Sequence, residues 1–159
     1  MSQNSPSARR INGAKLRIGV VAARFNEALV DGLLDRVLAG LSAAGVDAGR
    51  IRVVRVPGSH EVPWAAGRLA ATHRFDCIVA LGVLIGGDTN HHEMVGQSVS
   101  HALQRVALTT DIPVINGVIV TATAAQARAR CIGKINRGAE FASAALAMAE
   151  LKTSLKGKT

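Results

Sequence analysis

Aromatic residues are scarce in this sequence of 159 residues, which has three phenylalanines, one tryptophan and no tyrosine. The hydrophobic residues make up 48% of the chain and are therefore almost all aliphatic. A core built from Ala, Val, Leu and Ile suits an α/β layered fold. Few aromatic rings also disfavour a surface that stacks the bases of single-stranded nucleic acid. The length is that of a single domain.

Cysteine is nearly as rare, and long apolar runs are missing. Cys77 and Cys131 are too few for a disulfide framework and are not spaced as a zinc site, so we expect two reduced core thiols and no bound metal. No apolar run reaches the roughly 20 residues of a membrane helix, and the polar start lacks the hydrophobic segment of a signal peptide. We expect a cytoplasmic protein with no membrane partner.

The formal net charge of +8 is typical of a nucleic-acid-binding protein, but its position in the chain argues against that function. The first 17 residues contain four basic residues and no acidic one, and three lysines follow Glu150. These ends hold seven of the eight net charges, so the body between them is close to neutral. Basic ends of this kind are commonly solvated. We expect no specific nucleic-acid partner.

Apolar runs of strand length alternate with helical stripes along the chain. We predict strands at 16–23, 51–57, 75–85 and 112–120, and helices at 27–44, 64–73, 95–108, 124–130 and 136–151. Asn26 is placed to cap the first helix, and Gly45 to end it. The alternation predicts a three-layer, doubly wound α/β fold with a four-stranded parallel sheet and flavodoxin-like topology. One domain at 15–152 is expected between a flexible arm at 1–14 and a flexible basic tail at 153–159.

In an open parallel sheet, ligands bind beyond the carboxyl ends of the strands. The residues that follow the four predicted strands should therefore gather in one site. These segments are ARFN at 23–26, PGSHE at 57–61, GGDTNHH at 86–92 and TATA at 121–124.

The loop GGDTNHH has features of an anion site and of a proton-transfer site. Its two glycines let a ligand approach the backbone, and a helix that starts after the Asp-Thr pair offers free N–H groups to an anion. A capped turn accounts for the same residues equally well. His91 and His92 have side chains suited to proton transfer near neutral pH, although either can be a surface residue. As neighbours on a helix they point in different directions, which disfavours a shared metal.

Three other side chains in or near these loops have two interpretations each. An exposed Phe25 ring would stack on a planar heterocycle, whereas a covered ring would staple the following helix. Glu61 can cap a helix or accept hydrogen bonds from ligand hydroxyls. Arg130 can clamp a phosphate or remain a solvated charge.

In order and spacing, ARFN, VPGSHEVP, LGVLIGGDTNHHEMV, IPVINGVIVT, QARAR and NRGAEFASAALAMAEL resemble the lumazine synthase family over residues 16–151. The resemblance implies the penultimate step of riboflavin synthesis, in which 5-amino-6-ribitylamino-pyrimidinedione condenses with 3,4-dihydroxy-2-butanone 4-phosphate. Phosphate and water leave, 6,7-dimethyl-8-ribityllumazine forms, and neither a cofactor nor a metal takes part. The alternative is a paralogue that binds flavin-like ligands or forms a shell without catalysis.

The same resemblance implies a role for individual residues. His91 would be the catalytic histidine that moves protons, and Arg130 would be the charged clamp on the phosphate. Phe25 would stack on the pyrimidine ring. The other expected contacts are Ser59, Glu61, Leu84, Ile85 and Asn116 with the organic substrate, Gly87, Asp88 and Thr89 with the phosphate, and Arg137 as a further candidate.

The sequence departs from the family pattern at several of these positions. Gly86 stands where most members have Arg, Asn116 where many have Phe, and Arg137 where Lys is common. His60 replaces an aromatic or apolar residue. His92 stands where Phe or Tyr is frequent, and with His91 assigned to the protons it is expected to be a bystander.

The resemblance also implies an assembly. Family members form homopentamers with each site at a subunit boundary, and some build an icosahedral shell of 60 subunits. The segment at 131–136 is short, as in members that form the shell. We therefore expect a homopentamer competent for the shell, an N-terminal arm that can add to a neighbouring subunit, and riboflavin synthase as a candidate partner.

Overall fold

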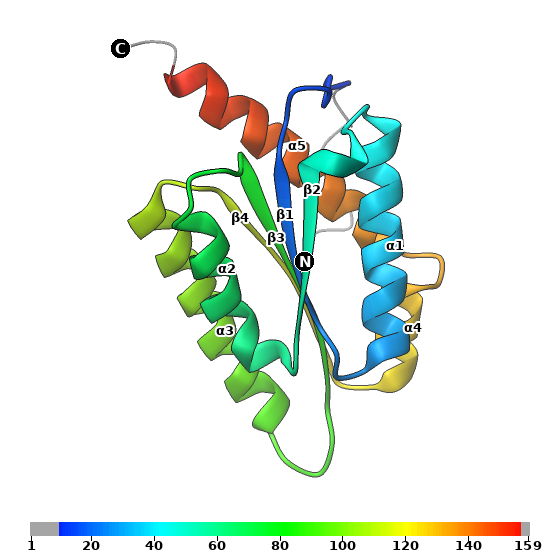
Figure 1. Ribbon diagram of the computed structural model, residues 1–159. Helices are drawn as coiled ribbons and strands as arrows, with labels where there is room; N and C mark the ends of the chain where they lie inside the picture. The colour runs from blue at the N-terminus through cyan, green and yellow to red at the C-terminus, as the bar shows by residue number, and fades with distance from the viewer. Residues whose placement is uncertain (1–9, 157–159) are drawn as a thin grey trace.

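The computed structural model describes residues 10–156, which form a four-stranded sheet between two layers of helices (Figure 1). Every neighbouring pair of strands is parallel, and Ile18 pairs with Ile51 on one side and Cys77 on the other. This arrangement confirms the predicted doubly wound α/β fold. The strands are β1 (Ile18–Ala23), β2 (Ile51–Val56), β3 (Cys77–Ile85) and β4 (Val114–Thr121), in the spatial order β2-β1-β3-β4.

Helices cover both faces of the sheet. Because helical crossovers connect parallel strands, the carboxyl ends of all four strands lie at the same edge. One face carries α2 (Val62–Ala70) and α3 (His91–Thr110), and the other carries α1 (Glu27–Ala43), α4 (Ala124–Cys131) and α5 (Arg137–Lys156) (Figure 1). Two short 3-10 turns, η1 (Ala48–Arg50) and η2 (Ser59–Glu61), lie before β2 and α2.

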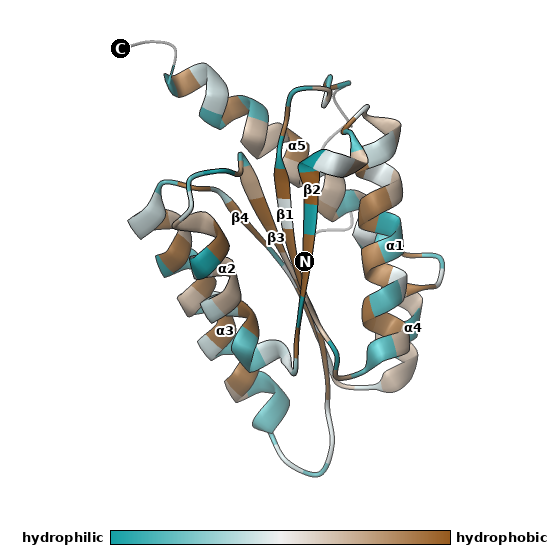
Figure 2. Ribbon diagram, viewed as in Figure 1, coloured by the Kyte–Doolittle hydropathy of each residue, from teal (hydrophilic) through white to brown (hydrophobic). Residues whose placement is uncertain are grey.

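The core is aliphatic, as the composition predicts. All six residues of β1 are buried, and β3 is buried from Cys77 to Val83. These strands form the apolar centre that Figure 2 shows in brown between the helices. The edge strand β2 instead exposes Arg52 and Val53. Phe75 is the one buried aromatic side chain in the described part of the chain.

The observed start of α3 differs from the prediction and matters for the site. The helix begins at His91, four residues before the predicted start. The carbonyl of Asn90 accepts hydrogen bonds from the N–H groups of Glu93 at 3.0 Å and Met94 at 3.2 Å, which close the first turn. The helix was predicted from the apolar stripe that begins at Val95. The first turn of α3 carries mostly polar side chains, so that stripe did not extend to it. Both histidines of the loop therefore belong to the helix N-terminus.

The last helix is longer than predicted. α5 continues to Lys156, so residues 153–156 are helical where we expected part of a flexible tail. Lys152 anchors this end, since its ammonium group donates to the carbonyl of Phe75 at 3.0 Å and lies 3.7 Å from the carboxylate of Asp76. The Thr153 hydroxyl also donates to the carbonyl of Ala149 at 3.0 Å. The remainder of the predicted tail lies outside the described residues.

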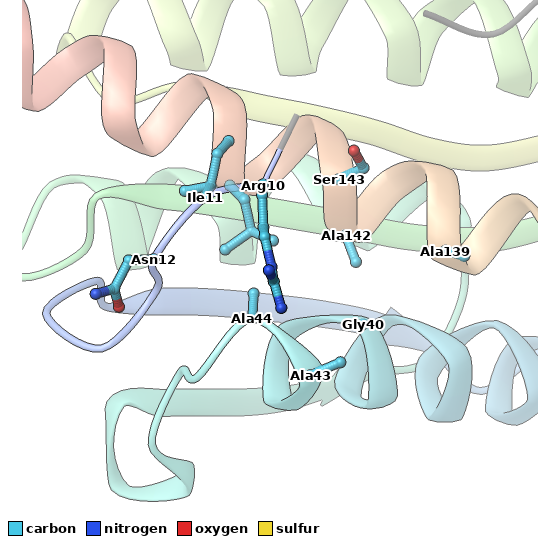
Figure 3. Close-up of a pocket in the computed structure, with 10 residues that line it drawn as sticks. Arg10, Ile11, Asn12, Gly40, Ala43, Ala44, Ala139, Ala142 and Ser143 are labelled. Carbon is cyan, nitrogen blue, oxygen red and sulfur yellow. The ribbon is translucent and has the colours of Figure 1, made fainter. Parts of the chain in front are cut away.

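The N-terminal arm predicted at 1–14 falls mostly outside the described residues. Where it is described, it packs on the domain: Ile11 is buried, and the N–H of Gly13 donates to the carbonyl of Ala44 at 2.7 Å. Figure 3 shows Ile11 and Arg10 beside a hollow of about 860 Å³ between α1 and α5. The α1 and α5 residues that line this hollow are mostly small, and none of the predicted site residues is among the lining residues.

None of the helices in residues 10–156 combines the length and the apolar character that crossing a bilayer requires.

Candidate active site

A pocket of about 440 Å³ lies at the carboxyl ends of the strands, where the topology predicts a ligand site. We call it the strand-end pocket. The loops after β1, β2 and β3 line it, together with the first turns of α3, whereas the loop after β4 does not. Its lining residues are Phe25, Asn26, Gly58, Ser59, His60, Glu61, Val83, Leu84, Ile85, Gly87, Thr89, His91, His92 and Val95.

The loop after β1 places an aromatic ring at the pocket. The N–H of Phe25 donates to the carbonyl of Pro57 at 3.0 Å, which ties this loop to the one after β2. The Phe25 side chain is 73% exposed, so it does not serve as the covered staple of the following helix. The exposed ring is free to stack on a planar ligand.

Asn26 holds this loop in a way that the sequence analysis did not predict. It occupies the N-cap position of α1 in the left-handed conformation, with a φ of 57°, and its side chain does not cap the helix. The side-chain amide instead donates to the carbonyl of Val83 in β3 at 2.8 Å. The short amide makes this conformation accessible to Asn. The predicted side-chain cap is therefore wrong, and Asn26 fixes the Phe25 loop to the central strand.

The loop after β2 supplies a carboxylate and a hydroxyl. One oxygen of Glu61 accepts a hydrogen bond from the N–H of Gly58 at 2.8 Å, so this carboxylate closes the turn. The other oxygen lies 3.9 Å from Nδ1 of the exposed His60. Ser59 is buried against β3 at 4% exposure, directly over Gly82, where a Cβ atom would lie 2.4 Å from the Ser59 hydroxyl oxygen. Gly82 therefore makes room for Ser59 in the pocket floor.

The loop after β3 brings the N-terminus of α3 to the pocket. Thr89 lies on the pocket wall, and its hydroxyl oxygen accepts from the N–H of His91 at 3.4 Å. The 20-residue helix directs free backbone N–H groups and the positive end of its dipole to this side. Asp88 is exposed in the same loop but does not line the pocket. The arrangement suits an anion beside the loop.

Both adjacent histidines line the pocket. His91 is exposed and His92 is half-buried, and both stand in the first turn of α3. His92, which was expected to be a bystander, also lines the pocket. As neighbours on a helix, the two side chains were expected to point in different directions, yet both line the pocket.

Three predicted residues lie away from the pocket of their own chain. Arg130 is on α4, which packs on the opposite face of the sheet from α3, and one of its guanidinium nitrogens donates to the carbonyl of Gln126 at 3.0 Å. Asn116 lies exposed in the edge strand β4. Arg137 is paired with Glu140 within α5.

Because Arg130 and Arg137 do not line the pocket, its lining residues include few charged side chains. Its described lining carries one carboxylate, Glu61, and three imidazoles, and neither an arginine nor a lysine is among those residues. Arg130, the expected phosphate clamp, is not among the residues that line this pocket. Among residues 10–156, no group of three or more His, Cys, Asp or Glu side chains is placed to hold a metal ion.

Both cysteines are free and buried, as predicted, and they lie away from the pocket. Burial raises the pKa of the Cys77 thiol to about 12 and that of the Cys131 thiol to about 11. A thiol reacts as a nucleophile through its thiolate. Neither cysteine is therefore a nucleophile at neutral pH.

The pocket also contains residues that sequence reasoning did not assign to a ligand. Most belong to segments already expected at the strand ends, so the topological rule identified the neighbourhood but not each side chain. Val83 and Val95 were predicted only as apolar residues of a strand and of a helix. The unassigned residues are Asn26, Gly58, His60, Val83, His92 and Val95.

Comparisons with known proteins agree with the resemblance of the motifs. A family model described as 6,7-dimethyl-8-ribityllumazine synthase matches residues 15–153. A protein of that name from Nitrosospira multiformis is 42% identical over 91% of this chain and 89% of its own length. A protein of the same name from Bordetella petrii is 43% identical over 92% of this chain and 82% of its own length. Another, from Coxiella burnetii, is 40% identical over 90% of this chain and 95% of its own length. The chain belongs to the 6,7-dimethyl-8-ribityllumazine synthase family.

Proposed function

We propose that this protein is a 6,7-dimethyl-8-ribityllumazine synthase of riboflavin biosynthesis. It condenses 5-amino-6-ribitylamino-pyrimidinedione, the amine substrate, with 3,4-dihydroxy-2-butanone 4-phosphate, the phosphate substrate. The observation that carries the proposal is the strand-end pocket, which unites Phe25, Glu61 and His91 in a chain of this family.

The side of the pocket that the loops after β1 and β2 form suits the amine substrate. The exposed Phe25 ring stacks on the pyrimidine, which is a planar heterocycle. Ser59 and Glu61 offer a hydroxyl and a carboxylate to the polar edge of the ring and to the ribityl hydroxyls. Leu84 and Ile85 line the ring site from the end of β3.

The outer part of the pocket suits the phosphate substrate. Backbone N–H groups of Gly87, Asp88 and Thr89, at the N-terminus of α3, bind the phosphate oxygens. This cradle stabilises the phosphate as it leaves with the electrons of the broken C–O bond. An arginine clamp would add a charge-assisted contact to the same oxygens.

His91 moves the protons of the reaction. The amine nitrogen attacks the ketone carbon, and two protons pass in turn from that nitrogen to the carbonyl oxygen, which departs as water as the C=N bond forms. An imidazole can accept one proton and return the other near neutral pH. His91 is exposed at the pocket mouth, within reach of a bound substrate. Holding two substrates together supplies much of the remaining acceleration.

Completion of the site requires a second subunit. Arg130 and Asn116 are not among the residues that line the pocket of their own chain, and Arg137 is paired with Glu140 within its own helix. We therefore propose that a neighbouring subunit brings Arg130 to the phosphate and Asn116 to the ring, with Arg137 as a further candidate.

The assembly that we propose is a homopentamer, competent to close into a shell of 60 subunits and to bind riboflavin synthase, in the cytoplasm. An exposed apolar hollow of about 540 Å³ between the end of α3, β4 and α5 supports self-association. Leu108, Met148, Leu151 and Leu155 lie at this hollow with exposed side chains. Exposed apolar surface of this kind marks subunit contacts in many proteins.

Product formation by the purified protein distinguishes the enzyme from a non-catalytic scaffold. Mixing the protein with both substrates should produce fluorescent lumazine faster than the uncatalysed reaction. His91→Ala should slow turnover by about 10²–10⁴-fold, the usual contribution of a general acid–base group, and more than His92→Ala does. His101→Ala, exposed on the same helix outside the pocket, is the matched control and should keep the wild-type rate. Equal, small effects at His91 and His92 would contradict the role of His91.

A further inference from the structure

Two side chains of the strand-end pocket have buried polar atoms without a hydrogen-bond partner: the hydroxyl oxygen of Ser59 and Nδ1 of His92. Three other such atoms occur among the described residues, all nitrogens of arginines. Each of those arginines makes a hydrogen bond through another nitrogen, Arg36 to Gly133, Arg55 to Asp31 and Arg137 to Glu140. Ser59 and His92 are thus distinguished by having an unpartnered buried atom at the pocket.

Buried polar atoms without partners are unfavourable, and in folded proteins each one calls for a reason. Ser59 is 4% exposed and packed over Gly82, so its hydroxyl cannot turn into bulk water. η2, which carries Ser59, packs against α3, which carries His92. If these two side chains turn toward a ligand bound in the pocket, both atoms gain hydrogen-bond partners.

The chemistry of these groups indicates which ligand they meet. A hydroxyl donates and accepts, and a neutral imidazole donates at one nitrogen and accepts at the other. Together they match a molecule with both donors and acceptors on one side, such as the N–H and C=O edge of a pyrimidinedione or a chain of hydroxyls. A phosphate offers mainly acceptors.

We infer that His92 is a binding residue for the amine substrate and that it donates or accepts a hydrogen bond beside Ser59. This inference rests on the proposed function for the identity of that substrate. It gives His92 a task different from that of His91: His92 contributes to the affinity for the amine, whereas His91 moves protons in turnover.

Two variants separate hydrogen bonding from packing at this position. His92→Phe keeps a flat ring and removes both nitrogens, whereas His92→Asn places an amide atom close to the position of Nδ1. The dissociation constant of the amine substrate alone is measured by calorimetry, and the KM of each substrate by product fluorescence. We expect His92→Phe to weaken amine binding and raise its KM about tenfold, as for loss of one hydrogen bond, with kcat changed less than threefold. His92→Asn should bind within about threefold of wild type, and the KM of the phosphate substrate should stay unchanged.

The outcomes that overturn the inference are distinct from failure of the proposed function. His101→Phe, exposed on α3 outside the pocket, should leave both constants unchanged and controls for the substitution itself. If His92→Phe binds the amine as wild type does while His92→Asn binds it weakly, His92 only fills space and the inference is wrong. A wild-type protein that binds the amine but forms no product would refute the proposed catalysis while the binding comparison still tests His92. A wild-type protein that does not bind the amine would overturn both.

Discussion

Gly86 permits a close approach between two loops of the site, and replacing it tests that approach. Its N–H donates to the carbonyl of Thr121 at 2.8 Å, which extends the pairing of β3 with β4. A Cβ atom on Gly86 would lie 2.6 Å from the carbonyl oxygen of Ala122 and 3.2 Å from its Cα. Backbone atoms cannot turn aside as a flexible side chain can. A side chain here overlaps the backbone of Ala122 and forces the two loops apart.

Gly87 offers a matched comparison because a Cβ atom there meets nothing within 4 Å. Neither glycine has a positive φ, so an alanine is compatible with both backbones. Gly→Ala also restricts the unfolded chain equally at the two positions, so that effect cancels between the variants. The remaining difference is steric overlap at Gly86, which costs about 1–3 kcal/mol in a packed site.

Urea unfolding of Gly86→Ala and Gly87→Ala measures this difference. With a denaturant slope of about 2 kcal/mol/M, a difference of about 2 kcal/mol lowers the midpoint of Gly86→Ala by about 1 M relative to Gly87→Ala. Both variants are compared at one subunit concentration, because assembly makes apparent stability depend on concentration. Equal midpoints would show that the contact between Gly86 and Ala122 does not constrain the loops.

Three further perturbations test other contacts. Lys152→Met should lower the free energy of unfolding by about 1–3 kcal/mol in urea, because it leaves the carbonyl of Phe75 without its donor, and Lys134→Met at an exposed position should not. Asn26→Ala should destabilise the protein more than Asn26→Gly, since both lose the bond to Val83 but glycine tolerates the left-handed backbone; the reverse order would contradict that conformation. Both cysteines should resist a thiol reagent at pH 8 until the protein unfolds. Because burial raises the folded-state pKa of Cys77 to about 12, above the ordinary value of about 8.5, stability should fall as the pH rises above 9 and unfolded thiols ionise.

Much of the fold followed from the sequence, because buried parallel strands leave clear aliphatic runs. All four strands and all five helices lie where the apolar patterns placed them, with shifted ends. The ends moved where polar contacts decide them: the carbonyl of Asn90 closes the first turn of α3, and Lys152 anchors the last turns of α5. Neither of these polar contacts leaves a periodic apolar pattern in the sequence.

The sequence predicted which loops form the site better than it predicted which side chains line the pocket. The rule for strand ends located three of the loops that line the pocket, and it required only the order of the elements. It did not show that Asn26 reaches across to β3, or that His92 faces the pocket beside His91. It also could not separate Arg130 from the pocket, because the face of the sheet that a helix covers depends on the path of the crossovers.

The condensation itself is the most direct test of the proposed function. The purified wild-type protein is incubated with the amine and phosphate substrates, and lumazine fluorescence and released phosphate are followed together. The account predicts equal amounts of lumazine and phosphate, formed well above the uncatalysed rate and strongly reduced in His91→Ala. Formation of lumazine at the uncatalysed rate would contradict it.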